Sequence, residues 1–294
     1  MKRKDSTWNY QFLVDYFSSP SGGGKKSKGI EFDFREVHTS NVRFNQIDQW
    51  TGRDLKASFS ALDVFIKSVD MNAMKASIES VNLENPMFMQ YDYTGSEPVT
   101  DVAVAPAEEN APVAQKKQPE GWLIDLKKLT MSNGSVWIKK QIDRDPANGH
   151  FEGQHLFFSR INGQVNELRF AHDSLQATLR LSALERSGLE LKNLSADFLF
   201  APGIMEFRNL DLETNRSRLR DYFAMRFESF NHDMNRFLHN VNLEAHFAES
   251  DLSSDDLAYF APSLSSWKKK FHFTGRAKGT VDNFSTDKFQ VSSG

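Results

Sequence analysis

Histidine, serine and acidic side chains are the groups from which this 294-residue chain would have to build catalytic or metal chemistry. The eight histidines show no HExxH pattern, and His232 and His239 lie seven residues apart with Asp233 between them. That spacing places both imidazoles on one face only in a helix, so ordinary surface histidines are favoured over a metal site. No GxSxG sequence supports a hydrolase nucleophile, and no GxGxxG sequence supports a nucleotide site. The absence of cysteine excludes disulfides, thiolate metal sites and a cysteine nucleophile.

Basic and aromatic residues form the second chemically distinctive group. Arg216, Arg218 and Arg220 alternate along the sequence, so in a strand they either hold phosphate oxygens or keep an outer face soluble, and we favour the second interpretation. The stretches RLRDYFAMRF at 218–227 and WKKKFHF at 267–273 resemble the basic and aromatic mixture of nucleic-acid sites. Neighbouring acidic residues, a net charge of −3 and a pI near 6.3 argue against nucleic acid as a partner.

The elements that must position these side chains are predicted to be β-strands. In Ser187–Phe223, apolar residues occupy alternate positions in short runs, and polar residues fill most of the gaps. These apolar residues are Leu189, Leu191, Leu194, Ala196, Phe198, Phe200, Leu210 and Leu212. The pattern predicts strand, turn and strand, with one apolar and one polar face. Similar runs at spacings of about ten residues predict an antiparallel meander.

Composition supports a mainly β chain whose strands are half exposed. Hydrophobic residues make up 39% of the sequence, yet 25 residues are phenylalanine. Few aliphatic and many aromatic residues suit strands with one solvent-exposed face. No run of about 18 apolar residues that would span a membrane occurs, and no signal peptide is found. Strand-like sequence close to the C-terminus leads us to expect a fragment of a longer protein.

Four segments are expected along the chain. Residues 1–20 predict a short amphipathic helix, with Trp8, Phe12 and Tyr16 on one face. Residues 21–94 predict the first β repeat, and the Pro- and Ala-rich residues 95–120 predict a disordered loop. Residues 121–294 predict the second and following β repeats, which continue beyond the end of this sequence.

An internal repeat underlies this division. The stretch FDFREVHTSNVRF, at 32–44, resembles IDLKKLTMSNGSVWI, at 124–138, and Asn41 corresponds to Asn133. Such similarity indicates an elongated sheet built from repeats. A further signal lies at SSDDLAYFAPSL, where Ser254 is expected to cap a short helix and Pro262 to close the turn that follows it.

Several long motifs carry a resemblance to a known family. KDSTWNYQFLVDYFSSP at 4–20, LSALERSGLELKNLSADFLF at 181–200, MEFRNLDLETNRSRLRDYF at 205–223, DLSSDDLAYFAP at 251–262 and GRAKGTVDNF at 275–284 occur in the family's order. With them the chain resembles the N-terminal portion of TamB-like proteins of Bacteroidetes type, within the AsmA-like group. The loop at 95–118 matches nothing in that pattern.

The resemblance implies an elongated β-sheet curled into a U-shaped apolar groove. It also implies a periplasmic protein anchored in the inner membrane by an N-terminal helix and working with a BamA-like outer-membrane partner. The anchor and the C-terminal region that meets this partner are expected to lie outside this sequence. Such proteins are implicated in carrying phospholipid to the outer membrane and in outer-membrane protein assembly.

Three functions are therefore compared. The first is a non-enzymatic lipid conduit without cofactor or metal, in which acyl chains lie along large inward-facing residues. We expect these to be Phe32, Phe34, Phe44, Ile124, Val136, Leu179, Phe198 and Leu212. The second is a scaffold for outer-membrane protein assembly or secretion, whose edge strands pair with a partner chain. The third, a glycan hydrolase on a β scaffold, needs a convergent carboxylate pair that the sequence does not single out.

Overall fold

A single large sheet dominates the computed structural model, which describes residues 35–70, 73–97, 121–141 and 148–293. Strands account for 69% and helices for 7% of the structure, which confirms the predicted mainly β class. The helix predicted for 1–20, most of the loop predicted for 95–120, and Phe32 and Phe34 lie outside the described residues. The U-shaped groove stays a prediction.

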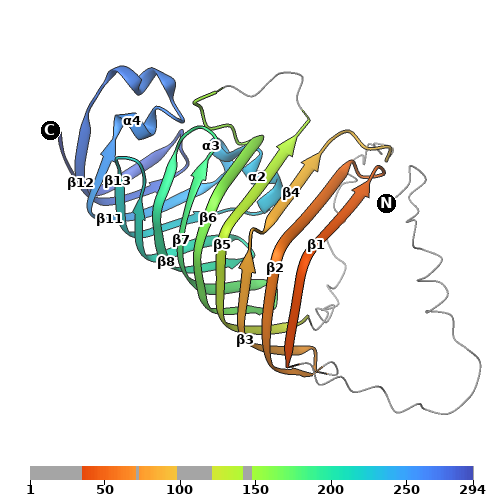
Figure 1. The fold of residues 1–294 in the computed structure, drawn as a ribbon. Helices are drawn as coiled ribbons and strands as arrows, with labels where there is room; N and C mark the ends of the chain where they lie inside the picture. Colours follow the sequence, from red (N-terminus) through yellow and green to blue (C-terminus); the bar gives the residue numbers. More distant parts are fainter. Residues whose placement is uncertain (1–34, 71–72, 98–120, 142–147, 294) are drawn as a thin grey trace, which may run out of the picture.

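Thirteen strands form the sheet, and they lie side by side almost entirely in chain order (Figure 1). They are β1 (Glu36–Asp48), β2 (Arg53–Asp70), β3 (Lys75–Glu84), β4 (Met87–Asp92), β5 (Leu123–Lys140), β6 (His155–Ala171), β7 (Ser174–Glu185), β8 (Glu190–Ala201), β9 (Ile204–Glu213), β10 (Arg218–Arg226), β11 (Asn242–Ser253), β12 (Lys270–Gly279) and β13 (Phe284–Ser293). The stretch 187–223, which predicts strand, turn and strand, forms β8, β9 and the first part of β10.

Two strand pairings correct the expectation of a wholly antiparallel sheet. Strands β3 and β4, separated at Asn85–Pro86, both lie between β2 and β5, and both pair with β5 in the parallel sense. A parallel pairing requires the chain to return along the full length of the strand, which takes a dozen residues or more. Residues 93–122 lie between β4 and β5 in the chain. The connection in sequence between β4 and β5 is therefore long enough for a parallel pairing.

The strands bend along their length (Figure 1). Residues of positive φ occur within many of these strands. In the N-terminal half, the side-chain amide of Asn133 donates to the Oδ1 of Asn85 at 2.7 Å, and the backbone N–H of Asn133 donates to the Oδ1 of Asn162 at 2.9 Å. Asn41 and Asn133, which correspond in the internal repeat, have φ values of 54° and 53°. The asparagines therefore occupy bulge-like positions that bend neighbouring strands together.

A second line of bends crosses the C-terminal half. Asn209 on β9, Asp221 on β10, Glu249 on β11 and Lys288 on β13 all have positive φ, and each lies at a shift in strand register. On β12, Gly275 occupies this line with a φ of 132°. A Cβ at Gly275 would lie 2.6 Å from the Cα of Phe289, so the glycine permits the close approach of β13.

Short helical segments accompany the sheet at two places. They are α2 (Phe230–Met234) and α3 (Phe237–Asn240) between β10 and β11, and α4 (Ser254–Leu257) and the 3₁₀ helix η1 (Pro262–Ser266) between β11 and β12. The expected cap is displaced by one residue, because Ser253 accepts the N–H of Asp255 and Ser254 is the first helical residue. Ser254 instead accepts the N–H of Lys269 at 2.9 Å, and Pro262 begins η1 rather than closing a turn.

Burial is shallow because the sheet is one layer thick over most of its length. Among the described residues, ten apolar side chains are buried, including Ala196, Ala224 and Val241. Most other apolar strand residues are only partly covered. The stability of the sheet therefore depends on contacts between side chains of neighbouring strands rather than on a second layer. The rings of Phe198 and Phe207, whose centroids are 5.1 Å apart, form one such contact.

Gly163 on β6 provides a test of this packing. Its φ is 152°, and a Cβ would lie 2.1 Å from the carbonyl oxygen of Arg180 on β7. We expect Gly163→Ala to lower the free energy of unfolding by about 1–3 kcal/mol, as measured by denaturant titration. Gly153→Ala is the control, because a Cβ there meets nothing within 4 Å. Equal stability of the two variants would contradict this account of β6 and β7.

Candidate functional site

The candidate site is one face of the sheet, which we call the apolar face. Its central row runs through eight strands, and each member is the register partner of the next. The row consists of Leu62, Leu83, Met131, Gly163, Leu181, Leu194, Leu212 and Leu219. Directly paired residues lie on the same side of a sheet, so the seven side chains of this row share one face, and Gly163 contributes backbone alone.

The neighbouring row, one residue along each strand, is polar throughout. It consists of Asp63, Asn82, Thr130, Gln164, Arg180, Ser195, Asp211 and Arg220. Because successive side chains alternate across a strand, this row lies on the opposite face, which we call the polar face. Apolar exceptions occur there, since the rings of Trp137 and Phe157 are 4.3 Å apart and the Nζ of Lys139 lies 4.0 Å from the Trp137 ring.

A second row extends the apolar face to the C-terminal edge of the sheet. It runs through eleven strands and contains Val69, Ala76, Ile124, Phe170, Leu175, Phe200, Met205, Met225, Leu243, Gly279 and Phe284. Phe284, on the edge strand β13, is 65% exposed. The apolar surface therefore continues up to the sheet edge instead of ending in polar residues.

Six of the eight residues expected to line a lipid path lie within the described part of the chain, and the pairing places them on this face. Ile124 belongs to the second row and Leu212 to the central row. Leu179 pairs with Ala196, and Phe198 pairs with Phe207. Leu179 lies two residues from Leu181 on β7, and Phe198 lies four residues from Leu194 on β8, so both face the same side of the sheet as the central row.

The remaining two lie on a third run of partners near the other end of the strands. Phe44 on β1 pairs with Ala57, which pairs with Phe88, and Phe88 pairs with Val136. Val136 in turn pairs with Phe158, which lines a cavity together with Leu212 and Leu219. Phe44 is 54% exposed, so the apolar surface also reaches the N-terminal edge strand of the described sheet.

The cavity lies where α4 covers the ends of β8 to β11. Its volume is about 360 Å³ and its walls are almost wholly apolar. The lining residues are Phe158, Leu189, Leu191, Leu212, Thr214, Ser217, Leu219, Leu252, Asp256, Leu257 and Phe260. Sequence reasoning missed most of these residues. Leu219 was detectable, because it alternates with Arg218 and Arg220 and so must face the other side of β10.

Hydrogen bonds to the carboxylate of Asp256 hold α4 in place over this cavity. The Oδ2 of Asp256 accepts from the hydroxyl of Thr214 at 2.6 Å and from the N–H of Arg216 at 3.0 Å. Asp256 is only 5% exposed, and its Oδ1 is buried without a hydrogen-bond partner. The carboxylate therefore ties the helix to the turn between β9 and β10, although the sequence marks it only as a helix-start residue.

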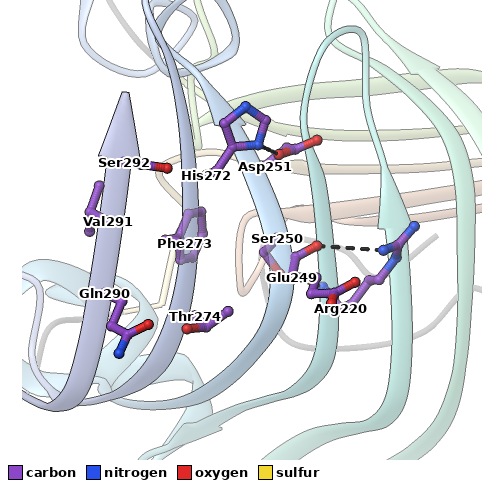
Figure 2. Close-up of a pocket in the computed structure, with 10 residues that line it drawn as sticks. All are labelled: Arg220, Glu249, Ser250, Asp251, His272, Phe273, Thr274, Gln290, Val291 and Ser292. Atoms are coloured by element: carbon purple, nitrogen blue, oxygen red, sulfur yellow. Dashed lines mark hydrogen bonds and ion pairs between the residues drawn. The ribbon is translucent and has the colours of Figure 1, made fainter. Parts of the chain in front are cut away.

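A larger cavity, of about 620 Å³, involves β10 to β13 and has a mixed polar and apolar lining (Figure 2). Figure 2 shows the imidazole of His272 directed toward Asp251, with which it forms an ion pair. Burial alone raises the pKa of Asp251, but the hydrogen bond from Lys270 and the charges of Lys270 and His272 together lower it. These are partly exposed ion pairs between neighbouring strands, which stabilise the strand pairing.

The three alternating arginines resolve into two roles. Arg216 precedes β10 and pairs with Asp255 at 2.7 Å. Arg218 donates two hydrogen bonds of 2.7 Å to the carboxylate of Asp211, and Arg220 lies 3.9 Å from the same group. Arg218 and Arg220 are thus engaged in ion pairs on the polar face, as expected for a charged outer surface, whereas Arg216 pairs with helix α4.

Comparison of the chain with protein-family models, with curated proteins and with solved structures finds no match. Within the described ranges, no helix has the length and apolar character needed to cross a membrane. The same part of the chain contains no group of three or more His, Asp or Glu side chains arranged to hold a metal ion.

The Arg218–Asp211 pair gives the polar face a definite response to acid. The hydrogen bonds from Arg218 lower the pKa of Asp211 below its ordinary value. A carboxyl with a lowered folded-state pKa stabilises the fold above its unfolded pKa of about 3.9, and this stabilisation is lost as the pH falls through the folded value. We expect Arg218→Gln to raise the pKa of Asp211, as measured by carboxyl carbon NMR titration.

Arg216→Gln is the matched control for this titration, because Arg216 pairs with Asp255 instead of Asp211. It should leave the Asp211 titration in place. An Asp211 pKa that is the same in the wild type and in Arg218→Gln would show that the two hydrogen bonds do not form in solution.

Proposed function

We propose that this chain is a non-enzymatic conduit for phospholipid, in which acyl chains lie along the apolar face. The observation that carries the proposal is the unbroken central row of apolar residues from Leu62 to Leu219, backed by a polar row on the opposite face. In the described part of the chain, four short helical segments accompany the sheet, and no second sheet lies against it. An apolar sheet face of this length requires an apolar partner.

An acyl chain can be this apolar partner, because its burial against the sheet is favourable in free energy. Full burial of a methylene group contributes about 0.8 kcal/mol, so a chain of a dozen methylenes gains roughly 10 kcal/mol when fully covered. On a one-sided surface, part of each methylene stays in water and the gain is smaller. Since the apolar rows cross successive strands without a polar interruption, a chain moves from one strand to the next while it keeps apolar contact. Such transfer needs no cofactor and no covalent step.

The resemblance to TamB-like proteins supplies the setting of the proposal. In that setting the chain is a periplasmic segment of a longer bridge, curled into a U-shaped groove, between an inner-membrane anchor and a BamA-like outer-membrane partner. The exposure of Phe44 and Phe284 on the two edge strands supports it, because apolar residues at an edge suit a face that continues onto a further strand.

A scaffold for outer-membrane protein assembly is the second candidate. Strands β1 and β13 are the two ends of the sheet order, and β13 is exposed along its whole length. An edge strand offers free backbone groups to a partner chain. This function predicts a bound polypeptide, whereas the conduit predicts bound lipid.

Charges placed in the central row test the conduit. Leu181 and Leu194 are register partners on the apolar face, and both are only partly buried, so polar replacements are compatible with folding. We expect Leu181→Asp with Leu194→Asp to reduce recovered lipid by about tenfold or more, because a charge among acyl chains costs about 2.5–3.5 kcal/mol. The measurement is photo-crosslinking to a lipid probe, with mass spectrometry of an organic extract of the purified protein.

The control carries the same two new charges on the polar face. Gln164→Asp with Ser195→Asp places them on either side of Arg180, in the row next to the central one. This variant should bind lipid like the wild type, and circular dichroism should show unchanged β content in both variants. Equal lipid recovery from the two double variants, or a bound polypeptide without lipid, would overturn the conduit.

A further inference from the structure

The cavity under α4 differs from the rest of the apolar face because residues of α4 and of the turn after it cover one of its sides. Its floor contains Leu212 and Leu219, the last two members of the central row. Its outer wall contains Leu257 of α4 and the adjacent Phe260. The cavity is thus continuous with the apolar face and roofed by a separate segment of the chain.

We infer that this cavity is a terminal site that takes the methyl end of an acyl chain. The inference rests on the proposed function and adds a fixed position to it. Its walls offer almost no polar surface, which suits hydrocarbon and disfavours a headgroup. An apolar cavity of about 150 Å³ binds one benzene molecule. A volume of about 360 Å³ therefore takes a hydrocarbon segment of roughly twice that size.

The roof of the cavity is held as a fixed wall. On the inner side, Asp256 accepts hydrogen bonds from Thr214 and Arg216 in the turn after β9. On the outer side, Asp255 pairs with Arg216 at 2.7 Å and with Lys268 at 2.8 Å. These bonds connect α4 to chain segments before and after it. A hydrocarbon end that enters from the apolar face therefore meets a wall that stops it.

Phe260 forms the exposed part of the cavity wall. Its side chain is 57% exposed although it lines the cavity, and its ring lies 4.9 Å from the ring of Phe151. The N–H of Phe151 donates to the carbonyl oxygen of Tyr259 at 2.9 Å, which fixes the two aromatic residues relative to each other. The contacts with Phe151 therefore brace Phe260, the exposed part of the cavity wall, and the remainder of a bound acyl chain lies back along the apolar face.

The test locates the two ends of a bound fatty acid. Stearic acid with a nitroxide near its methyl end should broaden the NMR signals of the Leu252 and Leu257 methyl groups. Stearic acid with the nitroxide beside its carboxylate should leave these signals sharp. Equal broadening by both probes, or stronger broadening by the carboxylate-side probe, would overturn the inference, and so would no broadening by either.

A variant that fills the cavity completes the test. Leu257→Trp replaces an aliphatic side chain of the cavity wall by a larger indole ring. It should abolish the broadening by the methyl-end probe. Leu264→Trp is the control, because Leu264 lies on η1 and does not line the cavity. Should Leu257→Trp unfold the protein, Leu219→Phe fills the same space from the sheet side. Persistent broadening in a folded cavity-filled variant would overturn the inference.

The results separate this inference from the conduit. Loss of lipid from Leu181→Asp with Leu194→Asp, together with no methyl-end broadening at α4, would overturn the terminal site alone. Methyl-end broadening at α4 in a protein from which neither crosslinking nor extraction recovers phospholipid would overturn the conduit alone.

Discussion

The register between strands is the constraint on which the rest of this structure depends. Side chains alternate across a strand with a period of two, so a slip of one residue in any pairing would move that strand's apolar residues to the polar face. The pairings from Leu62 to Leu219 keep this phase through eight strands. One continuous apolar face exists only because every one of these pairings is in phase.

Bends in the sheet put this phase at risk, because a bulge adds a residue to one strand of a pair. In this structure, neighbouring strands bend at matching positions along their length, so the pairing keeps its alternation. Asn209, Asp221 and Glu249 fall on one line across β9 to β11, and the register resumes in phase on both sides of it. On β10, Leu219 and Phe223 both face the apolar side although they lie on either side of the bend at Asp221. Curvature and a uniform face are thus compatible.

The sequence predicts the faces better than it predicts the connections. Alternation is a local property, so residues such as Phe198 and Leu212 are assigned to one face from their neighbours alone. The bends at Asp221, Glu249 and Lys288 carry no such signal, because these residue types are common on exposed strand positions. The parallel pairing of β3 and β4 with β5 depends on where a long connection returns, which composition does not encode.

The candidate site shows the same division. The apolar rows follow from alternation, but the cavity under α4 depends on a contact between segments about 40 residues apart. Asp256 accepts from Thr214 and Arg216, and nothing in the local sequence SSDDL distinguishes this carboxylate from the adjacent Asp255. The sequence correctly predicts a helix here, because the signal for a helix start is local. The cap falls at Ser253, because the hydroxyl of Ser254 accepts the N–H of Lys269 instead.

A one-layer sheet also has an energetic consequence for whatever covers it. Its buried core is small, and surface ion pairs such as Arg218–Asp211 contribute only about 0–1 kcal/mol each. A ligand that binds the folded sheet and not the unfolded chain adds its own binding free energy to stability. An open face with repeated apolar rows favours mobile occupancy, since neighbouring positions are alike. A cavity walled by Leu257 and Phe260 breaks that equivalence. In the proposed conduit, the two parts of the face therefore differ in role: movement along the rows, and arrest at α4.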